Sequence, residues 1–296
     1  MVSISRQDVI SSSMAQVHFD LSVVTVVLND KCGLEKTIQT VHDQRFINIE
    51  HIIVDGGSQD GSELLAMKHS SIAVESKADG GIYPAMQRGA ALATGKFLLF
   101  CNAGDLLFRQ DYLRNAIELL NKSDSEWGFG PIIEFTQRNT YVWVPANSNP
   151  TFESIISRKD FVPFPSFIVK RELFISAGGF SNNYKIAGDF ELICKVAKNR
   201  NFTIFEDPIA LFSAGGISYT KADEAWMEEI LIRREILNLD QLQMFREFVK
   251  FCLRFAKWKI GKFLDILETV WGKSSISWRD KRAHKVPIKY MVELSQ

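Results

Sequence analysis

Short acidic and glycine-rich turns follow several apolar runs of this sequence, and they carry the residue types most able to do chemistry. The three turns are Asp55-Gly56-Gly57, Asp79-Gly80-Gly81 and Asn102-Ala103-Gly104-Asp105. Aspartate–glycine pairs are common in ordinary turns, so each one alone indicates only a turn. Three of them at the carboxyl edge of one predicted sheet indicate a ligand site, because open α/β sheets bind ligands at that edge.

Asp55 comes directly after the apolar run Ile52–Val54. A carboxylate at the rim of a sheet can accept hydrogen bonds from a nucleobase N–H or a ribose hydroxyl, and Gly56 beside it lets the backbone approach a ligand closely. The alternative is that Asp55 caps a helix or shapes a turn.

Asp105 ends a small-residue turn that begins at Asn102. Mg²⁺ and Mn²⁺ prefer oxygen ligands and are often held by one or two carboxylates together with phosphates. One carboxylate with a neighbouring amide suits a cation held mainly by a diphosphate. The alternative is that Asp105 caps the helix expected over 112–120.

Asp189 begins a predicted helix over 189–198, directly after Gly188. A carboxylate fixed at a helix start can serve as a general base. Glu191 lies two residues further on and does not share its helix face, so at most one of the two points into a given pocket.

The elements that must position these residues alternate along the chain. The β-branched run 21–28 is typical of a strand buried on both faces of a parallel sheet. Further strands are expected at 51–54, 72–75 and 97–100, with helical spacing between them, which predicts an α/β doubly wound sheet. Residues 127–144 are β-rich, and from Asp223 onward the pattern is helical.

The composition is that of a globular protein, with 296 residues, 46% hydrophobic and 24% charged. Lys and Arg balance Asp and Glu at 35 each, yet residues 241–296 hold 12 basic and 5 acidic side chains. An acidic body is thus joined to a basic tail. The scattered cysteines argue against a zinc site, and no apolar run has the length of a membrane span. These features predict a cytoplasmic protein.

Several segments in unbroken order resemble the nucleotide-binding half of the family 2 inverting glycosyltransferases. They are residues 22–29, 49–62, 75–86 and 93–96, with 102–105 at the place of the D-x-D metal motif and 178–180 and 187–191 at that of the acceptor base. The resemblance spans roughly residues 20–220. It implies a GT-A fold and transfer from a nucleoside-diphosphate sugar, expected to be a UDP-hexose or UDP-N-acetylhexosamine, with inversion.

The resemblance also implies residue roles. Asp55 would hold the uracil, Asp79 would contact the nucleotide or sugar, Asp105 would bind Mn²⁺ or Mg²⁺ on the diphosphate, and Asp189 would deprotonate the acceptor hydroxyl. Gly56, Asn102 and Gly104 complete the expected donor site. The sequence departs from the family where Asn102 replaces a common Asp, Pro84 and Gln87 replace an Asp and an Asn, and Gly188 replaces an acidic residue.

The tail over 245–272 has the pattern of a basic amphipathic helix, which is typical of a segment lying on an anionic membrane. Its apolar residues recur at spacings of three and four or their sums: Phe245, Phe248, Cys252, Phe255, Phe263, Leu267 and Val270. Packing on the body and a dimer seam are the alternatives. Membrane contact would place the protein at the inner face of the cell membrane and predict a saccharide or polyprenyl-linked saccharide acceptor for polysaccharide synthesis.

The predicted organisation is a flexible leader over 1–18, a GT-A domain over 19–220 and a basic helical extension over 221–296. No G-x-G-x-x-G follows the first strand, which argues against a dinucleotide-dependent oxidoreductase. The acidic body argues against a nucleic-acid partner. The small metal motif leaves a catalytically silent glycosyltransferase-like scaffold, or a nucleotide-binding module, as the alternative function.

Overall fold

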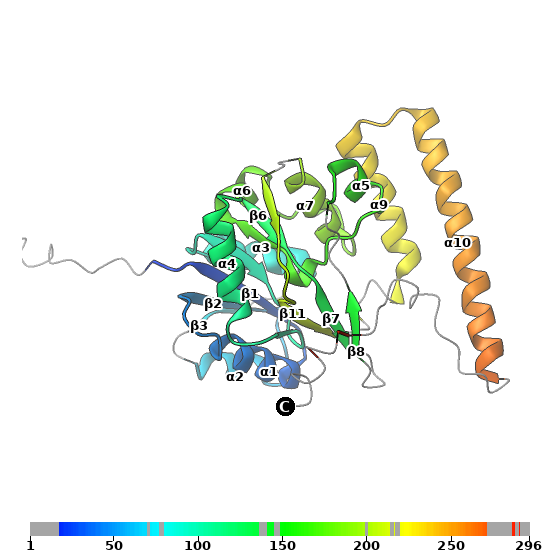
Figure 1. The fold of residues 1–296 in the computed structure, drawn as a ribbon. Helices are drawn as coiled ribbons and strands as arrows, with labels where there is room; N and C mark the ends of the chain where they lie inside the picture. Colours follow the sequence, from blue (N-terminus) through cyan, green and yellow to red (C-terminus); the bar gives the residue numbers. More distant parts are fainter. Residues whose placement is uncertain are drawn as a thin grey trace, which may run out of the picture.

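The computed structural model describes residues 18–69, 72–76, 80–135, 141–144, 149–198, 201–213, 216, 220–270, 286–287 and 290. They form a three-layer α/β body with a second small sheet and two C-terminal helices (Figure 1). The main sheet has seven strands in the order β10-β6-β9-β4-β1-β2-β3, and the second sheet has four in the order β5-β11-β7-β8.

The amino-terminal half builds the sheet region that carries the predicted site. Its elements are β1 (Leu21–Val27), α1 (Lys31–His42), β2 (Ile49–Asp55), α2 (Ser62–Met67), β3 (Ile72–Ser76), α3 (Ile82–Leu92) and β4 (Phe97–Phe100). β1 lies between β2 and β4 and is parallel to both, with Val27 opposite Asp55 and Val24 opposite Phe100. The parallel α/β sheet expected from the alternating pattern is confirmed.

β1 is buried along its whole length because helices cover both faces of the sheet. Leu21 and Val23 pack in a cluster with α4 (Tyr112–Lys122), whereas Val24 and Val26 pack with α3 on the opposite face. Successive side chains of a strand point to opposite faces, which explains the continuous apolar run.

β9 (Ile168–Lys170) lies between β4 and β6 (Trp127–Phe129) and is antiparallel to both. It is the neighbour that joins the amino-terminal strands to β6 and β10 (Phe202–Ile204). The sequence analysis did not anticipate this strand, because three residues carry too little periodicity to be recognised.

The remaining elements complete the body around this sheet. The second sheet consists of β5 (Leu106–Leu107), β7 (Ile132–Phe135), β8 (Tyr141–Val144) and β11 (Ala210–Ser213). Before β9 the chain forms α5 (Phe152–Ile156) and a 3-10 turn (Phe164–Ser166). After β9 it forms α6 (Arg171–Ser176) and α7 (Gly188–Val196). An aromatic group of Phe100, Phe164, Phe174 and Phe180 fills the core between β4 and these helices.

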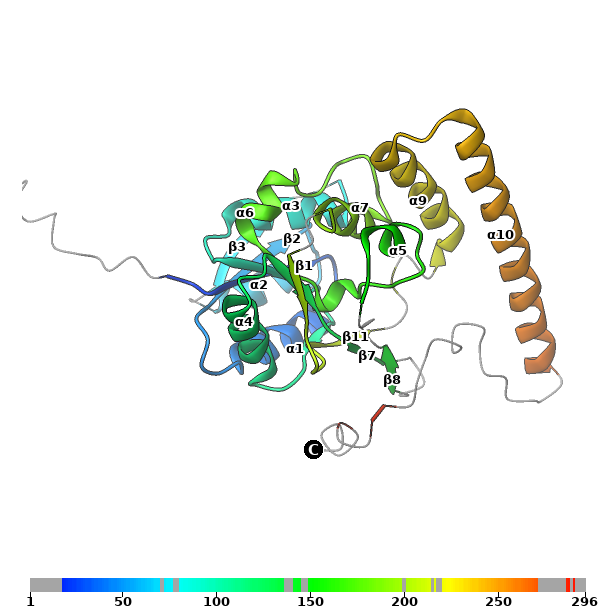
Figure 2. The ribbon, with the colours of Figure 1, turned by 45° about the horizontal axis from the view of Figure 1, so that its top comes forward.

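Two helices follow the body, α9 (Ala222–Leu237) and α10 (Gln241–Val270). α9 packs on the body, where Ile232 joins the largest core cluster. α10 turns back beside α9 and then extends away from the body, as both ribbon views show (Figure 2). Among the described residues, none of the helices combines the length and the hydropathy needed to cross a bilayer.

Residues near the carboxyl end of the sequence return to the body beyond α10. Val286 and Tyr290 are buried in a cluster with Phe108 and Ile133. The Tyr290 hydroxyl donates a hydrogen bond of 2.9 Å to Asp207. The predicted leader lies outside the described residues apart from position 18.

Candidate active site

Two loops meet at the carboxyl end of β1. In the loop after β2, the N–H of Gly56 donates a hydrogen bond of 2.9 Å to the carbonyl of Val27. In the loop after β4, the N–H of Ala103 donates one of 3.1 Å to the carbonyl of Val26. The turns carrying Asp55 and Asp105 therefore flank one strand end, as the sequence predicted for this edge of the sheet.

Asp55 is fully buried at the end of β2. Its Oδ2 accepts hydrogen bonds of 2.9 Å from the N–H groups of both Gly57 and Ser58. The turn role left open by the sequence is thus present, and Gly57 adopts a φ of 88° within this turn. Asp55 fixes the backbone course of the loop that any ligand at this edge would meet.

Asn29, two residues after the end of β1, ties a third segment to this turn. Its N–H donates to Ser58 Oγ at 2.8 Å, and its Oδ1 accepts from the N–H of Gln59 at 2.8 Å. Asn29 has a left-handed φ of 54°, a conformation that Asn adopts more readily than most residues. The sequence analysis assigned no role to it, although a polar residue at a strand end is a usable signal.

Asp105 is 5% exposed, and its Oδ1 accepts a hydrogen bond of 3.2 Å from the N–H of Ser213 at the end of β11. Burial raises the pKa of Asp105 to about 7, against the lowering effect of the backbone N–H groups that it meets. Because α4 begins after Asp111, Asp105 is not its cap. That alternative is excluded.

Thr37, on the buried face of α1, holds the loop in front of Asp105. Its hydroxyl donates to the Asp105 carbonyl at 2.8 Å and accepts from the N–H of Gly104 at 3.0 Å. Gly104 has a φ of 91°, which favours glycine. Thr37 was not predicted as a site residue, yet a polar residue on an otherwise apolar helix face marks it.

The ligand set for a metal is small. No group of three or more His, Cys, Asp or Glu side chains suited to a metal exists among the described residues. Asn102 Oδ1, however, is buried without a hydrogen-bond partner, and it stands three residues before the Asp105 carboxylate. These two oxygen donors fit a hard cation whose remaining ligands come from a phosphate group.

Asp189 lies at the start of α7, in a second cluster built with α3. Its Oδ1 lies 3.1 Å from the Tyr83 hydroxyl, whose single hydrogen also faces the Ile186 carbonyl at 2.7 Å. Burial, followed by the nearby charge of Asp189, raises the pKa of Tyr83 well above its ordinary value. Tyr83 therefore stays protonated and can donate to the carboxylate.

The protonation of Asp189 is set by opposing groups. Burial raises the pKa of its carboxyl above the usual aspartate value, and the Glu229 charge raises this pKa further. The Arg158 guanidinium and the N–H of Phe190 act in the opposite direction and lower it. Arg158 is held 4.0 Å above the Phe190 ring centroid and pairs with Glu229 at 2.9 Å. A carboxylate with a raised pKa is suited to accepting a proton.

Glu228 of α9 holds the loop that leads into Asp189. One of its oxygens accepts from the N–H of Lys185 at 3.0 Å, and the other accepts from those of Ile186 and Ala187 at 2.9 and 2.8 Å. A carboxylate that receives three backbone N–H groups makes strong, charge-assisted hydrogen bonds. The sequence analysis missed Glu228, because nothing local distinguishes it from the other acidic residues of a surface helix.

A cavity of about 380 Å³ opens beside this cluster, lined by residues 80–84, Asn182, Tyr184 and Lys185. Tyr83 thus contacts both the cavity and Asp189. Gln87, one of the departures from the family pattern, accepts a hydrogen bond of 2.9 Å from the Phe180 N–H and so anchors the Gly178-Gly179 turn.

The structure therefore brings Asp55, Gly56, Asn102, Gly104 and Asp105 to one strand end. Asp189 belongs to the neighbouring α3–α7 cluster, and Asp79 lies outside the described residues.

The sequence of this chain is similar to those of known glycosyltransferases. The sequence profile described as glycosyl transferase family 2 matches residues 22–175. An uncharacterized glycosyltransferase of Mycobacterium tuberculosis is 32% identical over 186 residues, which cover 60% of this chain and 68% of that protein. A PGL/p-HBAD biosynthesis glycosyltransferase of Mycobacterium bovis is 23% identical, covering 71% of this chain and 83% of its own length.

Solved structures share the fold. Staphylococcus aureus TarS 1–349 in complex with UDP-GlcNAc superposes with a TM-score of 0.62 at 18% identity, over 79% of this chain and 71% of that one. A mannosyltransferase of Pyrobaculum calidifontis in complex with GDP-Man and Mn²⁺ superposes with a TM-score of 0.56 at 15% identity, over 76% of this chain and 66% of that one. The GT-A fold class expected from the sequence is confirmed.

Proposed function

Since this chain belongs to glycosyl transferase family 2, we propose that it transfers a hexose or N-acetylhexosamine from a UDP-sugar to a saccharide hydroxyl with inversion at the anomeric carbon. The observation that carries the proposal is the convergence at the end of β1, where the turn after β2, with Asp55, and the turn after β4, with Asn102 and Asp105, are both hydrogen-bonded to the same strand end. The UDP-GlcNAc bound by the TarS structure supports this donor class.

In the proposed reaction, the loop held by Asp55 receives the uracil, and Asp79 contacts the nucleotide or sugar. Asp189 accepts the proton of the acceptor hydroxyl as its oxygen forms a bond to the anomeric carbon. The bond from that carbon to the diphosphate breaks at the same time, and UDP leaves with the electron pair. A single displacement of this kind inverts the anomeric configuration.

Asn102 and Asp105 would hold Mn²⁺ or Mg²⁺ against the diphosphate. The cation supplies charge neutralisation for the leaving group. Support comes from the unpartnered Asn102 oxygen and from the Mn²⁺ in the mannosyltransferase structure.

Calorimetric titration with UDP, with and without Mn²⁺, tests this function, with GDP and NAD⁺ as controls. We expect UDP to bind more tightly when Mn²⁺ is present, and this gain to disappear in Asp105→Asn. Turnover with UDP-hexose donors and NMR of the product anomer then test transfer and inversion. Preference for NAD⁺ or retention of configuration would contradict the proposal, and binding without turnover would favour the silent scaffold.

We further propose that α10 rests on an anionic membrane surface and brings the active site to a polyprenyl-linked acceptor. Leu242, Phe245, Val249, Leu253 and Ile260 form a stripe along α10 and are 40–67% exposed. Arg246 and Lys250 adjoin this stripe in the helical sequence, which suits acidic headgroups.

Flotation with vesicles of phosphatidylglycerol and phosphatidylcholine tests this contact. Leu253→Glu should reduce flotation. Leu64→Glu on α2 is the matched control and should float like the parent, because Leu253 and Leu64 are 67% and 66% exposed. Equal flotation of both variants and the parent would contradict the membrane proposal.

A further inference from the structure

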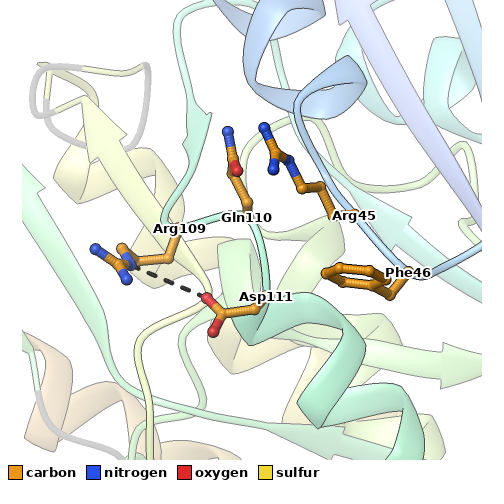
Figure 3. A pocket seen from close by; sticks show the side chains of 5 residues that line it. All are labelled: Arg45, Phe46, Arg109, Gln110 and Asp111. Atoms are coloured by element: carbon orange, nitrogen blue, oxygen red, sulfur yellow. Dashed lines mark ion pairs between the residues drawn. The ribbon is translucent and has the colours of Figure 1, made fainter.

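A second cavity, of about 450 Å³, lies before the amino-terminal end of β2, whereas Asp55 lies at the carboxyl end of that strand; Figure 3 shows the residues that line the cavity. It is lined by Arg45 and Phe46, before β2, and by residues 109–111, before α4. Asp55 is at the other end of β2, a separation of about 20 Å along a seven-residue strand. The cavity is therefore a strand's length from Asp55, and Arg109 follows Asp105 by four residues of chain, at most about 14 Å.

The two loops that form this cavity are locked together. The Arg45 N–H donates to the Gln110 carbonyl at 2.9 Å, and Gln44 Nε2 donates to the Arg109 carbonyl at 3.0 Å. Figure 3 shows the Arg45 and Gln110 side chains extending in the same direction, with Phe46 on one side and Arg109 on the other. The cavity is thus formed before any ligand arrives.

Two residues of the cavity are held in unfavourable backbone conformations. Phe46 has a φ of 61° and Arg109 a φ of 60°, in the left-handed region that side chains with a Cβ rarely adopt. Burial does not compensate for this cost at Phe46, which is 77% exposed. Strained residues of this kind gather at ligand-binding sites.

The cavity is also positively charged. Among the described residues, the Arg45 guanidinium has no hydrogen-bond or ion-pair partner, and that of Arg109 lies 3.9 Å from Asp111 with both side chains 44% exposed. A third arginine, Arg114, lies 5.6 Å from the centroid of the Phe46 ring. Arg114 also pairs with Glu118 at 3.5 Å, so Arg45 and Arg109 are the two arginines that line the cavity itself, together with the exposed Phe46 ring.

We propose that this cavity binds an anionic saccharide. Arg45 and Arg109 pair with its carboxylate or phosphate groups, because a guanidinium donates two parallel hydrogen bonds to such anions. Phe46 offers an apolar ring face to the C–H face of a sugar ring. The saccharide assignment rests on the proposed function, with this cavity holding part of an acidic acceptor chain away from the reacting hydroxyl.

Titration with a galacturonic acid hexamer tests the site, with neutral maltohexaose and inorganic phosphate as comparison ligands. We expect the acidic hexamer alone to bind, and its affinity to fall at least tenfold in Arg45→Gln and in Phe46→Ala. Arg234→Gln, at an exposed arginine of α9, is the matched control and should bind like the parent. Equal binding by parent, Arg45→Gln and Phe46→Ala would overturn the proposal, as would phosphate binding as tightly as the hexamer.

Phe46→Gly separates lost contact from lost folding. Glycine relieves the left-handed backbone, so this variant should have a higher Tm than the parent and still lose the hexamer. UDP affinity should stay unchanged in all these variants, and displacement of the hexamer by UDP would overturn the assignment of a separate site. Failure of UDP to bind the parent would instead count against the proposed function. The hexamer titration is done without UDP, so the two failures are distinguishable.

Discussion

Asp189, the proposed general base, is buried at a cost in stability. Burial raises the pKa of this carboxyl, so the folded protein disfavours its ionised form relative to the unfolded chain. This loss of folding free energy is absent below the ordinary aspartate pKa, because Asp189 is then protonated in both the folded and the unfolded chain. The loss grows as the pH rises above that value. A proposed general base must nevertheless be ionised to accept a proton.

Asp189→Asn is therefore expected to lower kcat by about 10²–10⁴-fold, the usual contribution of a general base, and to raise Tm at pH 7–8. The gain in Tm should vanish near pH 3, where the aspartate itself is neutral. Turnover assays and thermal melts at the two pH values check this. An unchanged kcat would remove Asp189 from the mechanism.

Arg158 and Glu229 act on Asp189 in opposite directions, so paired variants separate charge from packing. The Arg158 charge lowers the pKa of Asp189 and the Glu229 charge raises it. In the proposed mechanism, activity depends on ionised Asp189 and is expected to rise with pH through the pKa of this carboxyl. Arg158→Gln should move this rise to higher pH, and Glu229→Gln should move it to lower pH.

Both variants break the same buried ion pair, which joins Arg158 and Glu229 at 2.9 Å, so both should lower Tm. The profiles of kcat against pH give the result. Shifts in the same direction would mean that the pair acts through packing and not through its charges.

At the scale of elements, α9 positions the loop that precedes α7. Glu228→Gln replaces one carboxylate oxygen by an amide that meets backbone N–H groups of residues 185–187, so the loop loses acceptors. We expect kcat to fall by about 10–100-fold, from a loss of roughly 1–3 kcal/mol in hydrogen bonding, with UDP affinity unchanged.

Glu224→Gln is the matched control, because Glu224 is an exposed residue of the same helix, paired only with Lys221 among the described residues. It should retain full activity. If Glu228→Gln weakens UDP binding and kcat equally, its role is general stability and not positioning of Asp189.

The sequence predicted elements well where periodicity is strong. The run 21–28 and the strand 97–100 were recognised, because a doubly covered sheet requires continuous apolar residues. The turns after the strands predicted at 51–54 and 97–100 located Asp55 and Asp105. Glu228 escaped recognition because its partners lie 41–43 residues away, and local pattern carries no record of such contacts.

At the scale of the whole molecule, the carboxyl-terminal region is anchored to the body at two places. α9 contributes Ile232 to the largest core cluster, and Tyr290, 1% exposed, returns to the second sheet beside Ile133. α10, between these anchors, extends outward (Figure 1).

Tyr290→Ala is expected to destabilise the protein by about 3–5 kcal/mol, as for other large buried aromatic residues. Tyr290→Phe is the matched control, because it keeps the ring and removes the hydroxyl that donates to Asp207, a net loss of about 1 kcal/mol. Urea unfolding of the three proteins measures the difference. Equal stability of parent and Tyr290→Ala would show that the terminal segment is not anchored.

The antiparallel strand β9 has a consequence for how the chain is made. During synthesis β1, β2, β3 and β4 emerge first, but β4 has no neighbour on its outer side until Ile168–Lys170 leaves the ribosome. Until then Phe97–Phe100 is an open, wholly apolar edge, the kind of edge that pairs with other chains. Nascent chains stalled before residue 168 should therefore aggregate or recruit chaperones, and chains that extend past residue 204 should not.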